Sequence, residues 1–469
     1  MKKLLAILVA VLLVATCVVA LVACNKDPGI VIWVGTESEA FYKGIVEEYV
    51  EKYNAAHADE PFPFEITVKG VDSSSAAASV LNDAAAGPDI FTIPHDNLGK
   101  LLGENPVISA ITDPELLAQI EADNPDGYKN VIKTNLGGKD YIVGVPYIGQ
   151  ALVLYYNKDQ ITADEVKTWE GIMQAAKRVG DTTKATFPMG NDCYNLSLFT
   201  LARKIDARDA NGKITATSTT VKLYELPEGE TDVGKRLKGL YFQGDDTMAV
   251  YKWAQRFFAD PNGGMLNNDE IGPTIASKNA ITLIGGAWKF ADVKAAWGDK
   301  LAVAELPEFT ITEDDAYGTI TAGTQFKSGS FADCKVMVIN SFARKSHADY
   351  LQDIIKYMTT KEVQERSFIA CQNLPAYKNA SAEFEAMKGD TIEAQLAQMQ
   401  VSMANYGIPQ PFGYHTLLNN YYYSNGADTI IQDILLMRDS ANNNAKAYDT
   451  PELLKAGLIR VENLWRNVK

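Results

Sequence analysis

The chain has 469 residues, of which 46% are hydrophobic and 22% are charged, and its formal net charge is −15. A chain of this length is too long for one hydrophobic core, so we expect two lobes of about 150–200 residues each. The composition is that of an ordinary globular protein, and the negative charge argues against nucleic acid or an anionic membrane surface as the main partner.

The N-terminus has the pattern of an export signal. Lys2 and Lys3 precede an apolar run over residues 4–23, which leads into the tetrapeptide Leu21-Val22-Ala23-Cys24. A basic region followed by an apolar one is typical of a secretory signal peptide, although about twenty apolar residues are also long enough for a retained membrane anchor. The ending LVAC resembles the lipobox of bacterial lipoproteins, which implies cleavage before Cys24 and lipid on its sulfur.

We therefore predict a signal peptide over residues 1–23 and a short tether over residues 24–29. The mature protein is expected to be exported and to be lipid-anchored at Cys24 on the outer face of the cytoplasmic membrane. Several acyl chains give stable anchoring, so the lipid is expected to be the only attachment to the membrane.

The beginning of the mature chain alternates strands and helices. Predicted strands cover residues 30–34, 65–71 and 89–93, and a helix is expected after each of the first two. Thr36 and Glu39 have capping-box spacing at the start of the first helix. The alternation predicts a parallel sheet with right-handed crossovers, and ligands of such sheets bind at the carboxyl ends of the strands. Residues 35–38 and 94–97 lie at that edge.

A long extended stretch, YIVGVPYIGQALVLYYNKD over residues 141–159, is predicted to connect the two lobes. Fully extended it would reach roughly 60 Å, several times the length of an ordinary strand. Pro146 lacks an N–H and cannot pair inside a central sheet, and Gly149 is free to bend. We therefore expect one strand to end the first lobe, a hinge over residues 146–150 at the floor of a cleft, and a second strand to begin the other lobe.

The rest of the chain continues in the same α/β style. Thr168 is expected to cap a helix over residues 169–179, and Asn211-Gly212 marks a hairpin in a polar surface excursion over residues 205–240. Trp288 follows a predicted strand and two glycines, so its indole is expected on a loop. Further strands are predicted at residues 280–284, 301–306 and 336–339, and further helices at residues 247–258, 348–358, 361–369, 426–439 and 452–467.

Several short motifs occur in a fixed order along nearly all of the mature chain. They are the opening strand with Trp33, GPDIF followed by His95-Asp96, ALVLYYNKD in the crossing, KTWE after it, GGAWKF around Trp288, and GIPQ at residues 407–410. With this set the chain resembles the extracellular solute-binding proteins of sugar ABC transporters (family 1), closest to the maltose/maltodextrin-binding branch.

The resemblance implies an α/β, two-lobed periplasmic-binding-protein-like fold of type II. Each lobe is expected to be a mostly parallel sheet flanked by helices, and hinge strands are expected to cross between the lobes. Lobe one would comprise residues 30–148 and 305–358, and lobe two residues 149–304 and 359–469. The second crossing is expected near residues 301–306, and a third after residue 358.

The resemblance also implies a sugar site between the lobes. Asp96 matches an acid that accepts hydrogen bonds from sugar hydroxyls, and Trp288 and Tyr194 match stacking aromatics. Asp192 and Glu37 match further carboxylates. Sugars present neighbouring hydroxyls and flat C–H patches, which planar polar side chains and aromatic faces complement. The predicted substrate-binding residues are Glu37, Asp96, Asn97, Gln150, Asp192, Tyr194, Trp288 and Tyr414.

The chain departs from the family pattern at several positions of this site. Ile93 stands where the family has Trp, Asn97 where it has Arg, and Gln150 where it has Glu. The late stacking Trp of the family falls at His415, beside Tyr414. Fewer indole platforms favour a different or smaller sugar than a maltodextrin.

Together these features predict a substrate-binding lipoprotein of an ABC importer, which captures an oligosaccharide between two lobes and delivers it to the transmembrane subunits of a permease. The chain has no HExxH, nucleophile elbow, phosphate loop or paired CxxC, so we expect no enzymatic activity, metal or other cofactor. We also expect the receptor to be a monomer. Two alternatives stay open: a secreted glycoside-processing enzyme that uses Glu37 and Asp192, and a sugar-sensing lipoprotein that serves a signalling partner.

Overall fold

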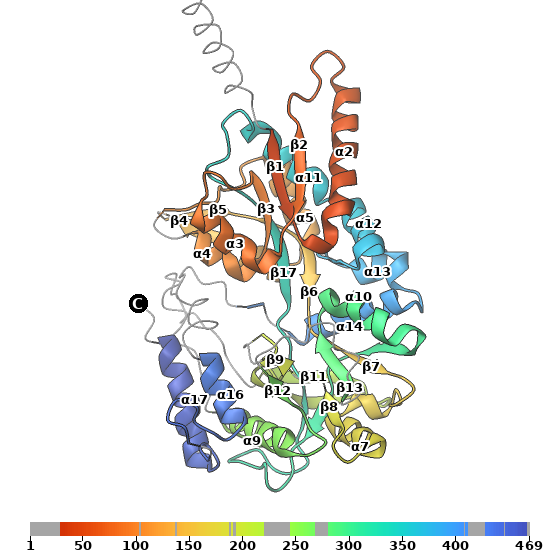
Figure 1. The fold of residues 1–469 in the computed structure, drawn as a ribbon, viewed down its shortest axis with the longest axis vertical. Helices are drawn as coiled ribbons and strands as arrows, with labels where there is room; N and C mark the ends of the chain where they lie inside the picture. The colour runs from red at the N-terminus through yellow and green to blue at the C-terminus, as the bar shows by residue number, and fades with distance from the viewer. Residues whose placement is uncertain are drawn as a thin grey trace, which may run out of the picture.

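A computed structural model shows an α/β protein with two lobes, one above the other in Figure 1. It describes residues 29–102, 105–136, 138–186, 189–190, 194–219, 244–267, 280–407, 409–410, 427–444 and 446–466. Each lobe has its own hydrophobic core around a sheet. Within these residues, no helix combines the length and the apolar character that crossing a membrane requires.

The first lobe is built on a six-stranded sheet of order β18-β6-β17-β3-β1-β2. Its strands are β1 (Ile30–Val34), β2 (Ile66–Gly70), β3 (Ile90–Pro94), β6 (Val145–Gln150), β17 (Asp333–Ile339) and β18 (Leu374–Pro375). Strand β1 pairs in parallel with β2 and β3, as predicted. Strands β17, β6 and β18 pair antiparallel, so the sheet is mixed rather than mostly parallel. The antiparallel strands are those through which the chain leaves and re-enters the lobe.

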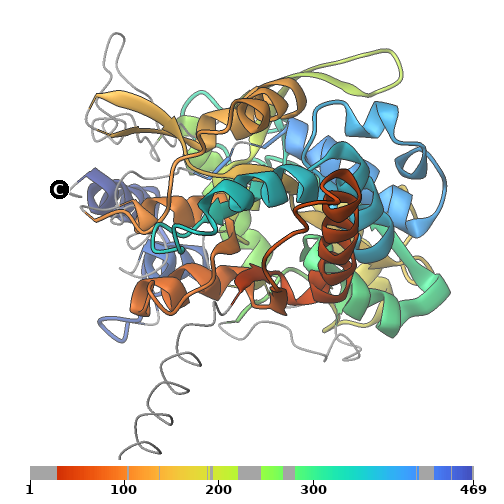
Figure 2. The ribbon, with the colours of Figure 1, turned by 90° about the horizontal axis from the view of Figure 1, so that it is seen from above.

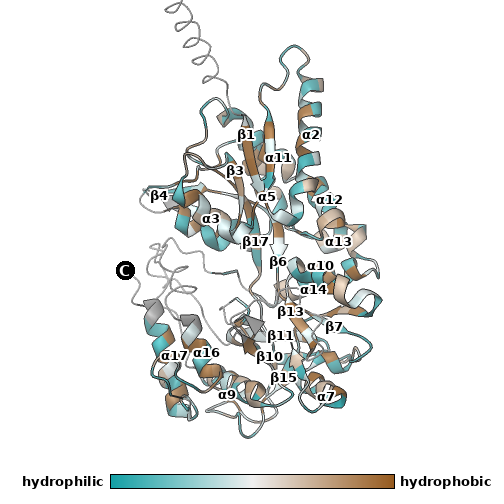
Figure 3. Ribbon diagram, in the orientation of Figure 1, coloured by the Kyte–Doolittle hydropathy of each residue, from teal (hydrophilic) through white to brown (hydrophobic). Residues whose placement is uncertain are grey.

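Helices cover the first sheet and bury apolar stripes against it. Helix α2 (Glu39–Ala56) buries Tyr42, Ile45, Val46 and Tyr49, and α11 (Ala348–Met358) lies beside α2 in the view from above (Figure 2). Figure 3 shows hydrophobic strands inside the lobe and alternating hydrophobic and hydrophilic bands along α2. The remaining elements are α3 (Ser73–Asn82), α4 (Leu98–Leu101), α5 (Pro114–Asp123), α6 (Asp126–Val131), β4 (Lys133–Leu136) and β5 (Lys139–Ile142).

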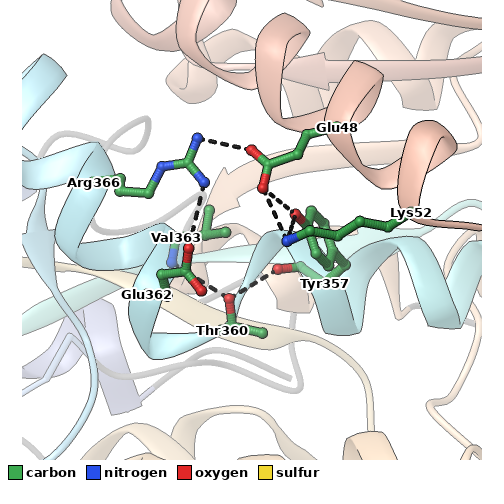
Figure 4. A network of polar contacts seen from close by, with 7 residues as sticks. All are labelled: Glu48, Lys52, Tyr357, Thr360, Glu362, Val363 and Arg366. Carbon is green, nitrogen blue, oxygen red and sulfur yellow. Dashed lines mark hydrogen bonds and ion pairs between the residues drawn. The ribbon is translucent and has the colours of Figure 1, made fainter.

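A polar network ties the start of α12 (Lys361–Cys371) to the first lobe (Figure 4). Glu48 accepts hydrogen bonds from Arg366 (Nη2 to Oε2, 2.9 Å) and from the hydroxyl of Tyr357 (2.8 Å). The Lys52 ammonium lies 2.9 Å from Glu48 Oε1, the same oxygen that accepts from Tyr357. Because α12 packs on α2 and the following β18 pairs with β6, the chain stays with the first lobe beyond residue 359, where the sequence predicted its departure.

The second lobe is built on a four-stranded sheet of order β14-β7-β13-β8. Its strands are β7 (Val153–Asn157), β8 (Lys184–Thr186), β13 (Ala280–Gly285) and β14 (Leu301–Ala304). The helices are α7 (Trp169–Val179), α8 (Ser197–Thr200), α9 (Asp245–Ala259), α10 (Phe290–Trp297), α14 (Ile392–Asn405), α16 (Ala427–Leu435) and α17 (Pro451–Arg466), and a short pair of strands is β9 (Met189–Gly190) and β12 (Leu266–Asn267). Helix α13 (Ala380–Glu383) instead packs Ala380 in a small separate cluster with Phe368 of α12 and Leu374 of β18. Thr168 caps α7 as predicted, since its Oγ1 accepts a hydrogen bond from the N–H of Gly171.

A further four-stranded sheet, of order β11-β10-β16-β15, joins two distant parts of the chain. The predicted hairpin forms β10 (Arg203–Arg208) and β11 (Ile214–Thr219), and Gly212 takes φ +80° in its turn. Strands β15 (Glu308–Thr310) and β16 (Gln325–Lys327) complete the sheet, and Phe309 and Phe326 join the second core. The chain therefore returns to the first lobe over residues 328–332, later than the predicted position near residues 301–306.

The first crossing also differs from the predicted hinge. Residues 146–150 belong to β6, and the chain passes between the sheets at residues 151–152. Pro146 is tolerated in this strand because β18 reaches only Ile148 and Gly149, so no strand needs an N–H from Pro146 on that side. The pairing with β17 is also irregular beside Pro146, between Lys335 and Val336, and the Pro146 carbonyl accepts a hydrogen bond from Asn124.

Candidate functional site

The described candidate residues of the first lobe lie at one edge of its sheet, where the strands end toward the second lobe (Figure 1). The 3-10 turn η1 (Thr36–Ser38) follows β1 and holds Glu37, and η2 (His95–Asn97) follows β3 and holds Asp96 and Asn97. Gln150 ends β6 and is paired in register with Asp333. The edge is thus the carboxyl end of β1 and β3, where α/β sheets bind ligands.

Glu37 is held by an ion pair that the sequence did not reveal. Its Oε1 lies 2.8 Å from the Nζ of Lys335, a residue of β17 that pairs with Pro94. Burial raises the pKa of Glu37, but the charge and the hydrogen bond of Lys335 together lower it by more, so the pKa lies below its ordinary value. The carboxylate is therefore ionised at neutral pH. The predicted capping box is wrong: Thr36 lies inside η1, and neither η1 nor α2 has a side-chain cap.

Asp96 and Asn97, the last two residues of η2, are both buried. The amide of Asn97 donates to Asp96 Oδ1 (3.3 Å), and its oxygen accepts from the Nζ of Lys100 (2.8 Å). Burial lowers the pKa of Lys100, and the charge of Asp96 opposes that shift. A chain of hydrogen bonds thus orients these side chains, so both sequence predictions fall on a fixed polar group.

A buried polar cluster lies directly behind this edge. Both oxygens of Asp333 accept hydrogen bonds from Gln410, from its backbone N–H (2.7 Å) and its side-chain amide (2.6 Å). His95 Nε2 lies 3.1 Å from the carbonyl of Gln410, and its Nδ1 lies 3.4 Å from the N–H of Cys334. Burial, with the charge of Asp96 adding to it, raises the pKa of Asp333 to about 6 against the opposing effect of His95. This cluster joins η2, β17 and the GIPQ segment.

The second lobe contributes aromatic side chains beside the two crossings. Trp288 lies in η6 (Ala287–Lys289), directly after β13, and is 41% exposed. Its indole lies over Gly286, where a Cβ atom would come within 2.0 Å of the ring. The ring of Tyr194 lies 5.8 Å from that of Trp288 and 5.8 Å from that of Phe331. Since Phe331 belongs to the returning segment 328–332, this aromatic group borders the crossing.

The structure thus brings the predicted residues into two groups on either side of the crossings. Glu37, Asp96, Asn97 and Gln150 form the polar group, and Tyr194 and Trp288 the aromatic group. Cys24, Asp192 and Tyr414 lie outside the described residues, as do the signal peptide and most of the tether.

Sequence reasoning missed Asp333 and Lys335, and it did not place Gln410 beside Asp333. The signal was available in part, because Asp333-Cys334-Lys335 directly precedes the apolar run that was predicted as a strand. A strand antiparallel to β3 has its beginning at the ligand edge, so its first polar residues belong to the site.

The arrangement offers what carbohydrate recognition requires. Ionised and amide oxygens accept hydrogen bonds from hydroxyls, amide and ammonium groups donate them, and an exposed indole covers C–H patches. In the part of the chain that the structure describes, no three or more His, Cys, Asp or Glu side chains are placed to hold a metal ion.

Comparison with known proteins shows relatives among transport receptors. The chain is 23% identical over 376 residues to the maltooligosaccharide ABC transporter solute-binding lipoprotein of Streptococcus pneumoniae (strain ATCC BAA-255 / R6), covering 76% of this chain and 75% of that protein. It is 20% identical over 401 residues to the galactooligosaccharide-binding protein of Bacillus subtilis (strain 168), covering 82% of each.

Solved structures share the fold, and the sequence matches a family over most of its length. Maltodextrin binding protein MalE1 from L. casei BL23 without ligand superimposes with a TM-score of 0.68 at 19% identity, covering 94% of this chain and 100% of that one. MalX from Streptococcus pneumoniae in complex with maltopentaose gives 0.64 at 17% identity, with coverage of 94% and 100%. Residues 48–395 match the family described as bacterial extracellular solute-binding protein, and the chain therefore belongs to that family.

Proposed function

We propose that this protein is the substrate-binding lipoprotein of an ABC importer, which captures an oligosaccharide between its lobes and delivers it to the membrane permease. The observation that carries the proposal is the pairing of a polar edge on the first lobe with an exposed indole on the second, on either side of the crossings. The names of its relatives, which are a maltooligosaccharide receptor and a galactooligosaccharide receptor, support the same class of ligand.

The proposed mechanism is closure of the two lobes on the sugar. The polar group of the first lobe binds hydroxyls, and Trp288 of the second lobe stacks on a ring face, so a bridging sugar interacts with both lobes only when they are closed. A ligand shifts a conformational equilibrium by its differential affinity for the two states, and here it favours the closed one. The permease then recognises the surfaces around the mouth of the closed form.

The ligand is proposed to be shorter than a long maltodextrin or differently linked. Ile93, which occupies the position of a family indole, is fully buried in β3 and offers no stacking face. The same proposal includes the two-lobe division, with chain crossings at residues 151–152, at residues 328–332 and after β18, and a monomeric receptor.

Calorimetric titration of the mature domain with a panel of gluco- and galacto-oligosaccharides of increasing length tests the proposal. We expect one sugar class to bind with micromolar or tighter affinity, which corresponds to about −8 kcal/mol or better. The sugars recovered after each titration are then analysed by chromatography. Intact sugar supports a receptor, released monosaccharide supports a glycoside-processing enzyme, and no heat from any sugar contradicts the ligand class.

Cys24 is proposed to carry the lipid that holds the receptor outside the cytoplasmic membrane. Metabolic labelling with an alkynyl fatty acid should label the native protein, whereas Cys24→Ala should be exported without label. Labelling of Cys24→Ala at the native level would contradict the anchor.

A further inference from the structure

Lys335 is a nearly buried cation at the polar edge of the first lobe. Its side chain is only 11% exposed, whereas that of its partner Glu37 is 43% exposed. The ammonium binds one oxygen of the carboxylate, Oε1, at 2.8 Å. The cation of the pair is therefore inside the protein and the anion faces solvent, which is the orientation expected if the carboxylate binds a ligand.

The missing side chain at Gly35 leaves room for this orientation of Glu37. A Cβ atom on Gly35 would lie 2.5 Å from Glu37 Oε1, so in this orientation the side chain of Glu37 occupies the space that a side chain at position 35 would need. Neither η1 nor α2 has a side-chain cap, and besides Lys335 the carboxylate has a hydrogen bond from the backbone N–H of Glu37 itself. The orientation of Glu37 thus depends on the space over Gly35 and on the ammonium of Lys335.

We propose that Lys335 is a positioning residue for sugar binding, which fixes one oxygen of Glu37 and thereby presents the other to a sugar hydroxyl. This inference rests on the proposed function of the polar edge. A free glutamate side chain populates several rotamers, and ordering it on binding reduces affinity. A carboxylate ordered beforehand avoids that loss, and an ionised acceptor forms stronger hydrogen bonds than a neutral one.

The groups around Glu37 give this role a distinctive pH signature. The Glu37 carboxylate interacts electrostatically with Lys335 of β17, Asp72 before α3, Tyr147 of β6 and Cys371 at the end of α12. Burial and Asp72 both raise the pKa of Glu37, and Lys335 lowers it. Without Lys335 the two raising effects remain, so the carboxyl group takes up its proton at a higher pH.

The experiment compares Lys335→Met and Lys335→Arg with the native protein by titrating the best-binding sugar of the panel from pH 4 to pH 8. We expect Lys335→Met to weaken binding tenfold or more at pH 7 and to shift the acid-side loss of affinity to higher pH. Lys335→Arg, which retains the charge, should keep affinity within about threefold. Adding Glu37→Gln to Lys335→Met should weaken binding little further, because both changes remove the same interaction.

Lys327→Met is the matched control. Lys327 is also a nearly buried lysine, paired with Glu305 at 2.6 Å in the second lobe, so its loss destabilises the fold without touching Glu37. An unchanged affinity and pH profile in Lys335→Met would overturn the inference while leaving the proposed function intact, and so would equal losses in Lys335→Met and Lys327→Met. Failure of the native protein to bind any sugar would overturn both. The pKa of the Glu37 carboxyl, followed by carbon NMR, should rise in Lys335→Met, and an unchanged value would also contradict the inference.

Discussion

Replacing the buried acid Asp333 by Asn should make the protein more stable at neutral pH. Asp333 is 1% exposed, and its pKa is raised from the ordinary value of 3.8 to about 6, chiefly by burial. The folded state therefore binds the proton more tightly than the unfolded state. The resulting stability is fully present below pH 3.8 and is lost as the pH rises through 6.

The size of the effect follows from the difference between the two pKa values. The difference between a pKa of 3.8 in the unfolded chain and one of about 6 in the folded protein corresponds to ~3 kcal/mol. Asn resembles the protonated acid in shape and charge, and its NH2 group can donate to Gln410 Oε1 after a flip of the Gln410 amide, so Asp333→Asn should match the native protein near pH 4. Above the pKa it no longer carries the cost of ionising a buried group, and its free energy of unfolding at pH 7 should exceed the native value by up to ~3 kcal/mol.

Urea unfolding of ligand-free protein, measured every half pH unit from pH 4 to pH 7.5, tests this reasoning. The two unfolding free energies should separate steadily between pH 4 and pH 6.5. Glu305→Gln is a control of opposite sign, because Lys327 lowers the pKa of Glu305 against its burial, so the native carboxylate stabilises the fold at neutral pH. Parallel pH profiles for Asp333→Asn and the native protein, or a variant that is less stable at pH 7, would refute the argument.

Three further changes test the aromatic group, the second core and the surface network. Trp288→Ala should weaken sugar binding at least tenfold in calorimetry, because a stacked aromatic face contributes up to about 1.5 kcal/mol beyond the area that it buries. Phe342→Ala, which removes a still more exposed aromatic ring (57% against 41% for Trp288), should leave affinity unchanged, and equal effects of the two changes would argue against stacking. Phe309→Ala should lower the free energy of unfolding by about 3–5 kcal/mol, because the ring is fully buried and stacks 4.3 Å from Trp253, and a loss below ~1 kcal/mol would contradict this packing. Arg366→Ala removes a surface ion pair with Glu48 and should lower the free energy of unfolding by less than about 1 kcal/mol. The difference should shrink in 1 M salt, and a larger, salt-independent loss of stability would contradict the assignment as a surface ion pair.

Local patterns in the sequence predicted much of the fold. The cap at Thr168, the turn at Asn211-Gly212 and the helix over residues 348–358 all formed where the residue types indicated. These signals act within a few residues of the chain, so no knowledge of distant partners is needed to interpret them. The same holds for the order of β1, β2 and β3, which placed Glu37 and Asp96 at one edge.

Features that depend on distant partners were not predictable in the same way. Pro146 lies in a strand because β18, more than two hundred residues later, leaves its side of β6 unpaired. The pairing of Glu37 with Lys335 spans 298 positions, and that of Asp333 with Gln410 spans 77. Single-residue patterns give no information on such pairs, so the polar edge was predicted without the cation and the buried acid that organise it.

The sheet of order β11-β10-β16-β15 has a practical consequence for engineering this receptor. Arg208 donates a hydrogen bond to Glu308, 100 positions later in the chain, across this sheet. The pairs β10–β11 and β15–β16 therefore form one unit, and any shortened version of the protein has to keep or remove them together. The tip at Asn211-Gly212 is exposed and far along the chain from either crossing. A fluorescent protein inserted there should leave lobe closure intact, which makes this turn the natural attachment point for a carbohydrate biosensor.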